Sequence, residues 1–568
     1  MRQLVARSSR VSLVNITRRR SLLIGSGAAL AAVTARVGRG ATRGKAAPRS
    51  ADYVIVGAGS AGCVLARRLS EAGASVILLE AGGADSLPQI QEPRDWPGLQ
   101  GSAVDWQYKT VPQPQTLDRV HAWARGKVLG GSGSINAMAH HRGHPSCYDS
   151  WQAQFGVRGW SFRELLPYFK RLESFALGAS DYHGGDGPIY VDVPRGELQH
   201  PAAQAFIASG VAAGWQPTDD INGPSMEGPT WNHVALRGRQ RQSPALCYLR
   251  PALAGRHPPA VLTGVRATRL RFDGKRCVGV DYVNEAHATA GGAGRRESTL
   301  RAHREVLLCT GSIESPKLLM LSGLGAPQEL ERHGIAVRVA LPGVGQNLQD
   351  HLLGAGNVYE ASRPLPLSNY QHGEGMHYLR TDAKLPGPDL LLMFVTVPFA
   401  SFTLPPPPAN AYTILPCIMQ PQSRGTIGLQ SADPLAAPRI DPRYFTASED
   451  LATMTRGFEV ARAIGSQAPL AAWRLREAYP AARWNEPRSR DEFVRNAVNT
   501  FFHPVGTCAM GIGPQAVVDE ALRVHGVEGL RVIDASVIPR IPSAATHAPV
   551  IAIAERAADL LLGRAPAA

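Results

Sequence analysis

The chain has 568 residues, more than a single hydrophobic core usually serves, so two or more domains are expected. A hydrophobic fraction of 44%, with 58 glycines and 44 prolines, is typical of a soluble, loop-rich enzyme and argues against a disordered or repetitive chain. Residues 1–50 carry 11 Lys and Arg and no acidic residue, which leaves only +3 of the net charge of +14 for the rest of the chain. Because the positive and negative charges of residues 51–568 nearly cancel, an extended nucleic-acid-binding surface is excluded.

The basic leader, residues 1–50, resembles an export signal. Arg19 and Arg20 precede an apolar run at 22–33 that is too short to span a bilayer, and a small-residue cleavage site follows at 33–35. Paired arginines are typical of the twin-arginine route, which carries proteins already folded around a cofactor. We therefore expect a periplasmic or otherwise exported protein without a transmembrane span. The alternative is a cytoplasmic protein with a basic tail.

Residues 51–83 predict a nucleotide-binding unit. A buried strand is expected at 53–56, a helix at 64–72 and a second, parallel strand at 75–80, with a glycine turn between the first strand and the helix. The alternative, a glycine-rich turn that binds nothing, does not account for the acid at the end of the second strand. A dinucleotide is therefore the expected ligand.

Each glycine of this turn has a separate physical function. Gly57 permits the turn, Gly59 lets the backbone approach a pyrophosphate, and Gly62 lets the helix pack closely on the strand. The N-terminus of the helix presents free N–H groups to the anion. Glu80 follows Gly62 by 18 residues, close to the roughly 20 expected for an acid that bonds a ribose diol.

Three further segments follow in chain order. Residues 125–136 hold four glycines among small polar residues and are expected to wrap a ligand with backbone N–H groups, a surface loop being the alternative. Residues 305–312 predict a buried strand that runs into a turn, with a helix at 316–321. A short strand at 530–536 then precedes an alanine-rich helix at 549–562. Nucleotide-domain strands that return so late in the chain imply an interrupted domain.

Together these motifs resemble those of the glucose–methanol–choline (GMC) oxidoreductases, which are FAD-dependent alcohol oxidases and dehydrogenases. The motifs, which occur in the order of the family, are the turn at Gly57, the loop 126–136, the segments 311–316 and 322–325, and the tail 503–555. The resemblance covers essentially all of residues 51–568. Residues 126–143 and 532–555 are most similar to the choline dehydrogenase branch.

The resemblance implies an α/β fold, in which a Rossmann-like FAD-binding domain of the glutathione reductase type carries an α+β substrate domain built on an antiparallel sheet. Both domains are expected to be discontinuous. The FAD-binding domain is expected at 51–156, 236–350 and 505–568, and the substrate domain at 157–235 and 351–504. Strand-like runs at 390–397, 411–419 and 425–429 are candidates for the antiparallel sheet.

The cofactor that the resemblance implies is FAD. The implied binding residues are Gly57, Gly59, Ser60, Gly62 and Glu80 at the ADP half, Gly126, Gly130, Gly131, Ser132 and Asn136 at the flavin, Val265 at the adenine and Asp534 at the ribityl chain. The final helix is implied to point its N-terminus at the flavin, where its dipole stabilises the anionic reduced form. Ile135 stands where some oxidases carry the histidine that attaches to the flavin, so non-covalent FAD is expected.

Two histidines near the C-terminal end are implied to carry the chemistry. His503 occupies the family's general base position, where an ordinary pKa near neutrality suits proton transfer. His547 occupies the partner position, and the hypothesis is that it holds the alkoxide oxygen by hydrogen bonding. Phe501 and Phe502 flank the base and indicate a partly apolar pocket, whereas His351 is expected to be structural, at the domain junction.

Three features qualify the resemblance. His140 and His141 replace an aromatic or apolar pair, and the sequence offers no reason for them. Residues 544–547 differ from the Gly-Asn-Thr-Asn common in choline dehydrogenases, which argues against choline as the substrate. The seven cysteines are scattered without a CxxC pair, so they are expected in the core and no metal site is indicated.

The predicted reaction is oxidation of a small-molecule alcohol to an aldehyde or ketone, with hydride transfer to flavin N5 and a histidine as general base. Electrons are expected to pass to a quinone, a cytochrome or another acceptor. The first alternative is an oxidase that converts O2 to hydrogen peroxide. A hydroxynitrile lyase on the same scaffold and a non-catalytic FAD-binding protein are further alternatives.

Overall fold

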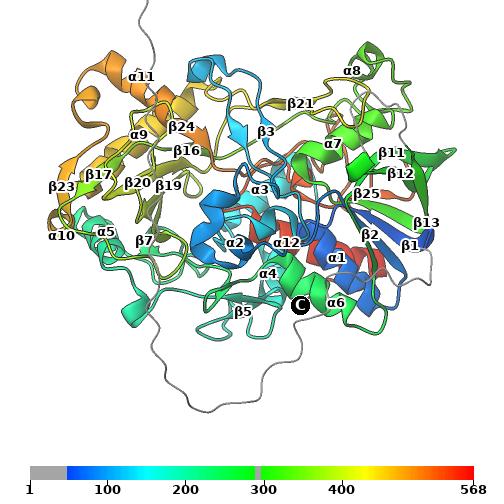
Figure 1. Ribbon diagram of the computed structural model, residues 1–568, viewed down its shortest axis with the longest axis horizontal. Helices are drawn as coiled ribbons and strands as arrows, with labels where there is room; N and C mark the ends of the chain where they lie inside the picture. Colours follow the sequence, from blue (N-terminus) through cyan, green and yellow to red (C-terminus); the bar gives the residue numbers. More distant parts are fainter. Residues whose placement is uncertain (1–47, 288–295, 568) are drawn as a thin grey trace, which may run out of the picture. The chain divides into compact units, whose positions relative to one another are not determined.

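The computed structural model describes residues 48–287 and 296–567, which are arranged around two seven-stranded sheets (Figure 1). The predicted twin-arginine signal lies outside the described residues. The fold below is therefore that of the chain from Pro48 onward.

The first sheet carries the predicted nucleotide-binding pattern. Its strands in spatial order are β10 (Ala260–Thr263), β2 (Val76–Glu80), β1 (Ser50–Val56), β13 (Ser298–Leu308), β12 (Arg276–Asn284) and β11 (Val265–Asp273), with β25 (Leu530–Val532) also on β13. One edge of β13 pairs with β1 in parallel orientation. On its other edge, the first residues of β13 pair with β12 in antiparallel orientation, and its last residues pair with β25 in parallel orientation. The chain thus returns to this sheet after long excursions, and the strands predicted near residues 53, 75, 305 and 530 are confirmed.

Two helices that border this sheet begin earlier than the sequence predicts. Helix α1 (Ser60–Glu71) starts directly at the glycine turn, and α7 (Gly311–Leu321) contains Pro316 in its interior. Proline has no N–H to donate to the carbonyl of Ser312. The hydroxyl of Thr507 donates to that carbonyl instead, at 2.7 Å. A contact from a distant segment therefore replaces the missing hydrogen bond, and the sequence around the proline does not reveal it.

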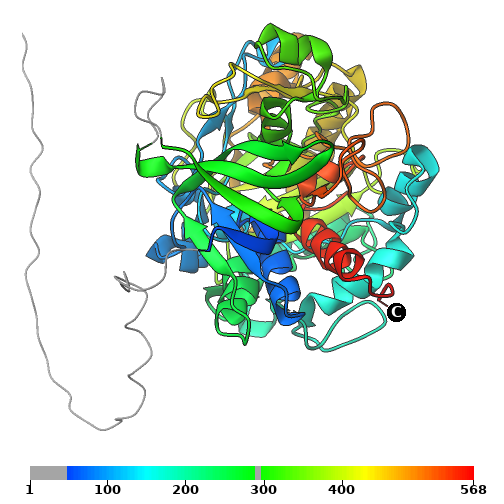
Figure 2. The ribbon, with the colours of Figure 1, turned by 90° about the vertical axis from the view of Figure 1, so that its right-hand side faces the viewer.

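Helices α1 and α12 (His547–Leu562) pack side by side, which joins the two ends of the described chain (Figure 2). Both oxygens of the buried Glu555 accept hydrogen bonds from the Arg68 guanidinium at 2.8 Å, and the Tyr248 hydroxyl adds a third at 2.9 Å. A buried carboxylate with three hydrogen-bond donors is well satisfied. Loss of one partner would leave a buried negative charge without compensation and would destabilise the fold. This packing brings the start of α12 next to the glycine turn that precedes α1.

The second sheet is entirely antiparallel, as the resemblance implies. Its strands are β18 (Gly373–Leu379), β19 (Leu390–Val395), β20 (Ala411–Ile418), β16 (Leu352–Gly354) and β24 (Val498–Thr500) in spatial order, with β17 (Val358–Ala361) on β20 and β23 (Arg474–Glu477) on β17. Successive side chains point to opposite faces. Leu390, Leu392 and Phe394 accordingly pack in the cluster covered by α5 (Pro201–Ala212) and α9 (Ser448–Gly465).

The third run predicted for this sheet lies elsewhere. Residues 425–429 contain β21 (Thr426–Gly428), which pairs only with β22 (Arg439–Asp441) in a separate ribbon. Periodicity predicts that a strand forms but not which partner it finds, because pairing depends on where the connecting chain leads. The proposed domain boundaries stay a prediction.

The remaining elements are short. The helices are α2 (Pro88–Gln91), α3 (Pro145–Phe155), α4 (Phe162–Arg171), α6 (Arg250–Leu253), α8 (Pro327–Arg332), α10 (Ala468–Ala471) and α11 (Pro487–Ala497), and the strands are β3 (Tyr108–Lys109), β4 (Ala122–Trp123), β5 (Glu173–Phe175), β6 (Ile189–Val191), β7 (Gly228–Trp231), β8 (Leu236–Arg237), β9 (Gln240–Arg241), β14 (Leu324–Gly325) and β15 (Val339–Ala340). Within residues 48–287 and 296–567, none of the helices combines the length and apolarity that crossing a bilayer requires. All seven cysteines are buried and free, as predicted.

Candidate active site

A cavity of about 460 Å³ contains almost all of the predicted site residues. Twelve of the fourteen line it, and only Gly62 and Gly130 do not. We name two parts of its wall. The glycine half consists of Gly57, Gly59, Ser60, Gly126, Gly131, Ser132 and Asn136, and the sheet half consists of Leu353, Met376, Met393, Val395, Leu415 and Phe501.

The glycine half is built from two turns that touch. A Cβ on Gly131, whose φ is +54°, would lie 2.7 Å from the Cα of Gly59, so the loop has no room for a side chain at Gly131. Gly130 lies behind the wall and donates its N–H to the carbonyl of Ala58 at 2.8 Å. Gly62 also lies behind it, since its Cβ would meet the carbonyl oxygen of Gly57 at 2.0 Å. The two residues outside the cavity therefore support the wall from behind.

This half offers backbone donors to an anion. Helix α1 has Gly59 as its N-cap, and no side chain bonds to the cap. The N–H groups of its first turn have no partner within the helix, and the dipole favours negative charge there. A glycine cradle with free N–H groups fits the pyrophosphate of a dinucleotide such as FAD.

Glu80 is held at the end of β2 by backbone donors. Its two oxygens accept from the N–H of Ala58 at 3.0 Å and of Gly82 at 2.8 Å. Burial outweighs these hydrogen bonds and raises the pKa of the carboxyl to about 7. Each oxygen keeps a further acceptor site, so a ribose hydroxyl can still be bound.

Asp534 lines the cavity just beyond β25, but the protein itself occupies its carboxylate. Oδ2 accepts from the N–H of Gly311 at 2.8 Å and the hydroxyl of Ser315 at 2.6 Å, while Oδ1 accepts from the N–H and hydroxyl of Ser536 at 2.8 and 2.6 Å. Burial raises its pKa in spite of these bonds. The carboxylate therefore positions the start of α7, and its predicted contact with the ribityl chain stays a prediction.

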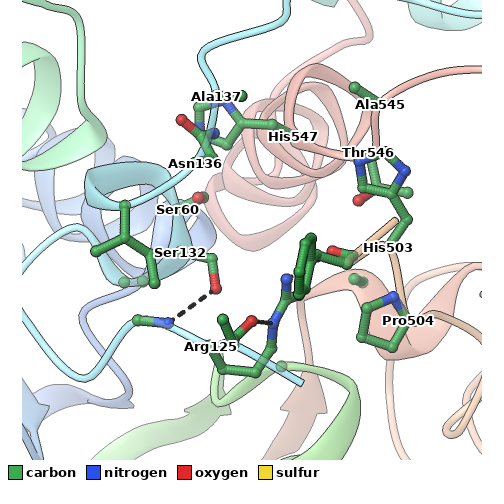
Figure 3. A pocket seen from close by; sticks show the side chains of 18 of the residues that line it. Ser60, Arg125, Ser132, Asn136, Ala137, His503, Pro504, Ala545, Thr546 and His547 are labelled. Atoms are coloured by element: carbon green, nitrogen blue, oxygen red, sulfur yellow. Dashed lines mark hydrogen bonds between the residues drawn. The ribbon is translucent and has the colours of Figure 1, made fainter. Parts of the chain in front are cut away.

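His503 projects into the cavity from the segment after β24 (Figure 3). Its backbone N–H donates to Oδ1 of the buried Asp350 at 2.8 Å, and the hydroxyls of Tyr444 and Thr500 each donate to Oδ2 at 2.6 Å. The Phe501 ring lies 4.6 Å from the imidazole, centroid to centroid. Burial, and with it the positive charge of Arg125, lower the pKa of His503 well below its ordinary value, so the ring is neutral at pH 7.

The hydrogen bonds of His351 determine which nitrogen of His503 carries the proton. Nε2 of His351 lies 3.1 Å from the carbonyl of Met419, which can only accept, so this nitrogen is protonated. Burial lowers the pKa of His351 to about 3, and in the neutral ring Nδ1 is then an acceptor. Nδ1 of His503, at 2.9 Å, must donate to it. The free lone pair of His503 therefore belongs to Nε2, for which the described residues provide no hydrogen-bond partner.

His547 lies at the first position of α12, but its imidazole is turned towards Asn136, on the side of the cavity across from His503 (Figure 3). Both ring nitrogens are buried and have no hydrogen-bond partner in the described chain. Nε2 faces Gly133, where a Cβ would lie only 2.8 Å from it. Burial, and then the charge of Arg241, lower its pKa to about 4. The structure thus brings His547 to the cavity wall without presenting a nitrogen to the cavity.

Comparisons with known proteins show the family of this chain. Two family models, both described as GMC oxidoreductase, match residues 51–353 and 421–554. This chain is a GMC oxidoreductase. It is 39% identical over 509 residues to pyridoxine 4-oxidase of Microbacterium luteolum, covering 89% of this chain and 98% of that protein, and 38% identical over 550 residues to mitochondrial choline dehydrogenase of Homo sapiens, covering 90% of each. The crystal structure of pyridoxine 4-oxidase from Mesorbium loti superposes with a TM-score of 0.85 at 39% identity, covering 90% of this chain and 99% of that one.

Membership settles the class of the enzyme. GMC oxidoreductases are FAD-dependent alcohol dehydrogenases and oxidases, and this chain is an enzyme of that class. The glycine half, in which the N–H groups at the start of α1 have no partner within the helix, fits FAD, the cofactor of the family. Within the described residues, no group of three or more His, Cys, Asp or Glu side chains has the geometry of a metal site.

Three residues near the base of this GMC oxidoreductase were missed by sequence reasoning or given another role. His351 was expected to be structural, whereas it bonds directly to His503. Asp350 was not predicted, and Arg125 was included only as the first residue of the ligand-wrapping loop 125–136. Asp350 holds the backbone of His503, and the Arg125 guanidinium donates to the carbonyl of Phe502 at 2.5 Å and lines the cavity. The pairing of β16 with β24 brings these segments together, and only the expected place of His351 at the domain junction hinted at it.

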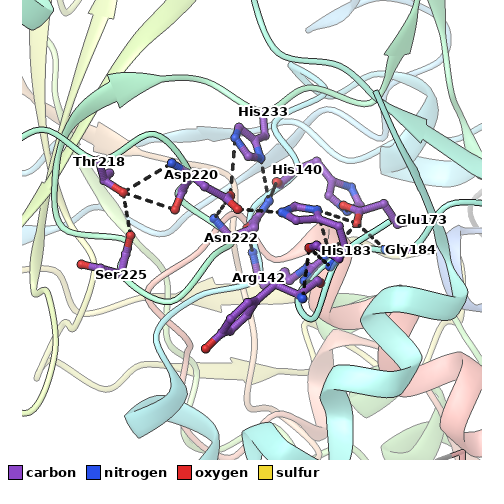
Figure 4. Close-up of polar contacts among 12 residues, drawn as sticks. His140, Arg142, Glu173, His183, Gly184, Thr218, Asp220, Asn222, Ser225 and His233 are labelled. Atoms are coloured by element: carbon purple, nitrogen blue, oxygen red, sulfur yellow. Dashed lines mark hydrogen bonds and ion pairs between the residues drawn. The ribbon is translucent and has the colours of Figure 1, made fainter. Parts of the chain in front are cut away.

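The structure also shows the surroundings of His140 and His141. His141 bonds through Nδ1 to the hydroxyl of Tyr378 and through Nε2 to Oδ1 of Asn232, both at 2.7 Å, and Asn232 lines the cavity. His140 lies on the other side, in a buried polar cluster, with its Nε2 3.6 Å from Glu173 (Figure 4). The pair therefore connects the cavity wall to this cluster.

The polar cluster is centred on His183, which lies between two carboxylates (Figure 4). Nδ1 is 2.8 Å from Glu173 and Nε2 is 2.9 Å from Asp220, and Glu173 also accepts from Arg142 at 2.5 Å. Carboxylates only accept, so both ring nitrogens donate and the ring is an imidazolium. Burial opposes this charge, but the hydrogen bonds to Asp220 and Glu173 outweigh it and raise the pKa of His183. His183 thus ties the strand β5 to the loop at residue 220.

Proposed function

We propose that this enzyme oxidises the CH–OH group of a small alcohol to an aldehyde or ketone, with His503 as the general base. The observation that carries the proposal is the protonation state of His503, which is neutral, donates from Nδ1 to His351 and keeps a free lone pair on Nε2. A base must be unprotonated and must direct its lone pair at the substrate. Both conditions follow from contacts in this chain.

The residues around His503 stabilise its ring both before and after it accepts a proton. Nε2 accepts the proton of the substrate hydroxyl, and the resulting imidazolium keeps its hydrogen bond from Nδ1 to His351. His351 cannot change its own proton arrangement easily, because the Met419 carbonyl requires the proton on its Nε2. The base is therefore held in one tautomer and one orientation throughout.

FAD supplies a hydride acceptor, flavin N5, when it is bound. Gly59 and Ser60 would hold its pyrophosphate with backbone N–H groups, and Glu80 would bind its ribose. The N–H of Gly57 donates to the carbonyl of Leu79 at 2.9 Å, so Gly57 would contribute only the shape of the turn. Ile135 is buried beside the cavity and has no group that could form a bond to the cofactor. We infer non-covalent FAD, which acid precipitation of the protein should release completely into the supernatant.

The role of His547 needs a separate test, because its nitrogens do not reach the cavity in this structure. We propose that it helps to hold the substrate oxygen after its ring turns away from Gly133. In that case H547A lowers kcat/KM, and H547N, which keeps a donor, restores part of it. Equal activity of H547A and the wild type would leave it a packing residue.

Electrons are proposed to leave to a quinone or another carrier. The specific alternative is oxygen, since one relative is named an oxidase and other relatives, 38% identical, are named oxygen-dependent choline dehydrogenases. Stoichiometric hydrogen peroxide under air favours the oxidase. Fast turnover with a quinone and little peroxide favours the dehydrogenase.

For localisation we propose export through the twin-arginine signal predicted in residues 1–50. Sequencing the N-terminus of the protein isolated from its native host tests this, since cleavage near residue 35 is expected. An intact N-terminus on the functional protein would contradict export.

The main proposal is tested with H503A. The variant should keep its bound flavin but lose about 10²–10⁴-fold in kcat/KM, the contribution typical of a general base. H257A is the matched control, because His257 is exposed in a turn after α6. Near wild-type turnover by H503A would exclude His503 as the base.

A further inference from the structure

The sheet half of the cavity is apolar throughout. Alternate residues of β19 face it, so Met393 and Val395 line the cavity while Leu392 and Phe394 pack on the opposite face of the sheet. The other members of the sheet half come from β18, β20, β16 and the segment before His503: Met376, Leu415, Leu353 and Phe501. None of these six side chains carries a hydrogen-bonding or ionisable group. Atoms of a substrate that reach past His503 therefore meet carbon and sulfur.

The polar residues next to the sheet half are uncharged, and they have hydrogen-bond partners among the described residues except at Nδ1 of His372. Gln371 bonds through its amide to both backbone groups of Gly373 at 2.8 and 2.9 Å. Nε2 of His372 lies 3.2 Å from the carbonyl of Arg94, and burial lowers the pKa of that histidine, so it is neutral. Asn232 bonds to His141 and to the carbonyl of Gly373. This edge of the cavity offers no counter-charge to a substrate.

The three carboxylates among the residues that line the cavity lie on the nucleotide side and have partners. Glu80 bonds to backbone N–H groups, Asp534 has four donors, and Glu314 accepts from the Tyr108 hydroxyl at 2.6 Å and pairs with Lys317 at 3.2 Å. Near the base, the Arg125 guanidinium lines the cavity, whereas the carboxylate of Asp350 does not line it and accepts from the N–H of His503 and the hydroxyls of Tyr444 and Thr500. A cationic group placed between His503 and the sheet half would lose its hydration and find no carboxylate.

Methionines make up much of this wall. Met376 and Met393 line the cavity, and Met226 and Met419 pack behind them in the same cluster. The chain has only nine methionines, so this cluster holds a large share of them. Methionine is unbranched and polarisable, and it adapts to ligands of different shape. The wall therefore suits bulky apolar groups and does not impose one fixed outline.

We propose that the substrates of this enzyme are uncharged alcohols with an apolar body, rather than quaternary ammonium alcohols or hydroxy acids. The inference rests on the proposed function, since it assigns the alcohol that His503 deprotonates. It places the hydroxyl at His503 and the apolar body against Met376, Met393 and Leu415.

The proposal is tested by mixing the FAD-loaded enzyme, under anaerobic conditions, with three alcohols of similar size and measuring the reduction of the flavin. They are 3,3-dimethylbutan-1-ol, choline, which has the same shape with a positive nitrogen, and 4-hydroxybutanoate, which is an anion. The neutral alcohol should reduce the flavin with a kcat/KM about 100-fold or more above that of either ion, because an unpaired charge is costly in this wall. An ion that reacts as well as the neutral alcohol would overturn the proposal. If that ion is choline, the result would show that an aromatic side chain such as Phe501 is enough to stabilise a bound cation.

Calorimetry of the same three compounds keeps the two proposals separate. If no alcohol reduces the flavin but the neutral one binds more tightly than choline, the proposed reaction fails while the assignment of an apolar, uncharged ligand stands. If choline binds more tightly, the assignment fails whatever the reaction is.

A charge placed in the wall provides the matched variants. M393E should raise the preference for choline over 3,3-dimethylbutan-1-ol at least tenfold, because it supplies the missing counter-charge at a position that is only partly buried. M393Q has the same shape without the charge and should keep the neutral preference. An equal shift in both variants would show that shape rather than charge selects the substrate, which would contradict the proposal.

Discussion

The two halves of the cavity are built from different parts of the chain. The glycine half presents mostly backbone, because four of its seven residues are glycines and two are serines, and all seven come from two short stretches near the start of the described chain. The sheet half consists of side chains delivered by four strands and the segment after β24. A surface of backbone N–H groups suits a ligand that is the same throughout the family. A surface of side chains can differ from one member to the next, so it is the part that selects the substrate.

The largest expected effect comes from adding one carbon to the glycine half. G131A should purify without flavin, because its Cβ would lie 2.7 Å from the Cα of Gly59 and its φ is +54°. The absorbance at the flavin band per protein measures this directly. G513A is the control, since nothing lies within 4 Å of a Cβ there. A G131A protein with full flavin content would show that the glycine half does not require backbone contact.

The two faces of β19 offer the next comparison. L392A should lower the free energy of unfolding by about 2–5 kcal/mol, because it empties a fully packed site under α5 and α9, and should leave KM unchanged. M393A, one residue further, should be less destabilising and should change KM for apolar alcohols. Denaturant unfolding measures the loss of stability in both variants, and steady-state kinetics measure the change in KM. The reverse result would place the cavity on the other face of the sheet.

A smaller effect is expected at His351. H351A removes the acceptor for Nδ1 of His503, a buried hydrogen bond worth about 1 kcal/mol, so kcat/KM should fall by several-fold to tenfold. It should also move the acidic limb of the pH profile to lower pH, because the neutral His351 accepts a hydrogen bond that is stronger from the imidazolium of His503 than from its neutral ring. H351Q can accept from His503 and donate to Met419, and should restore most of the rate. A purely structural residue would change stability without moving the pH profile.

The smallest expected effect lies outside both halves, at His183. Its pKa is raised in the folded state, so its contribution to stability is complete below the unfolded value of about 6.5 and is lost as the pH rises through the folded pKa. Asp220 has a lowered pKa, and its contribution is lost as the pH falls below about 3.8. Unfolding free energies of the wild type should therefore decline above neutrality, and H183Q should flatten that decline while H257Q does not. Parallel curves for the wild type and H183Q would exclude an imidazolium between Glu173 and Asp220.

The sequence by itself predicted the fold class and the cofactor side of the site. The strand, glycine turn, helix and acid of the nucleotide unit lie within residues 51–83, and such local patterns determine backbone geometry through contacts between near neighbours. The same pattern could not show that α7 starts before Pro316, since the hydroxyl of Thr507 stabilises that turn from far along the chain.

Only the tertiary structure decided the protonation of the base and the chemistry of the substrate wall. His351 and His503 are 152 residues apart, and they meet because β16 pairs with β24. The nitrogens of His547 are buried against Gly133 although its position in the sequence suggested a group facing the substrate. Which nitrogen carries a proton, and which face of a strand meets the cavity, depends on hydrogen bonds and packing between distant segments. Those contacts exist only after the sheets have assembled.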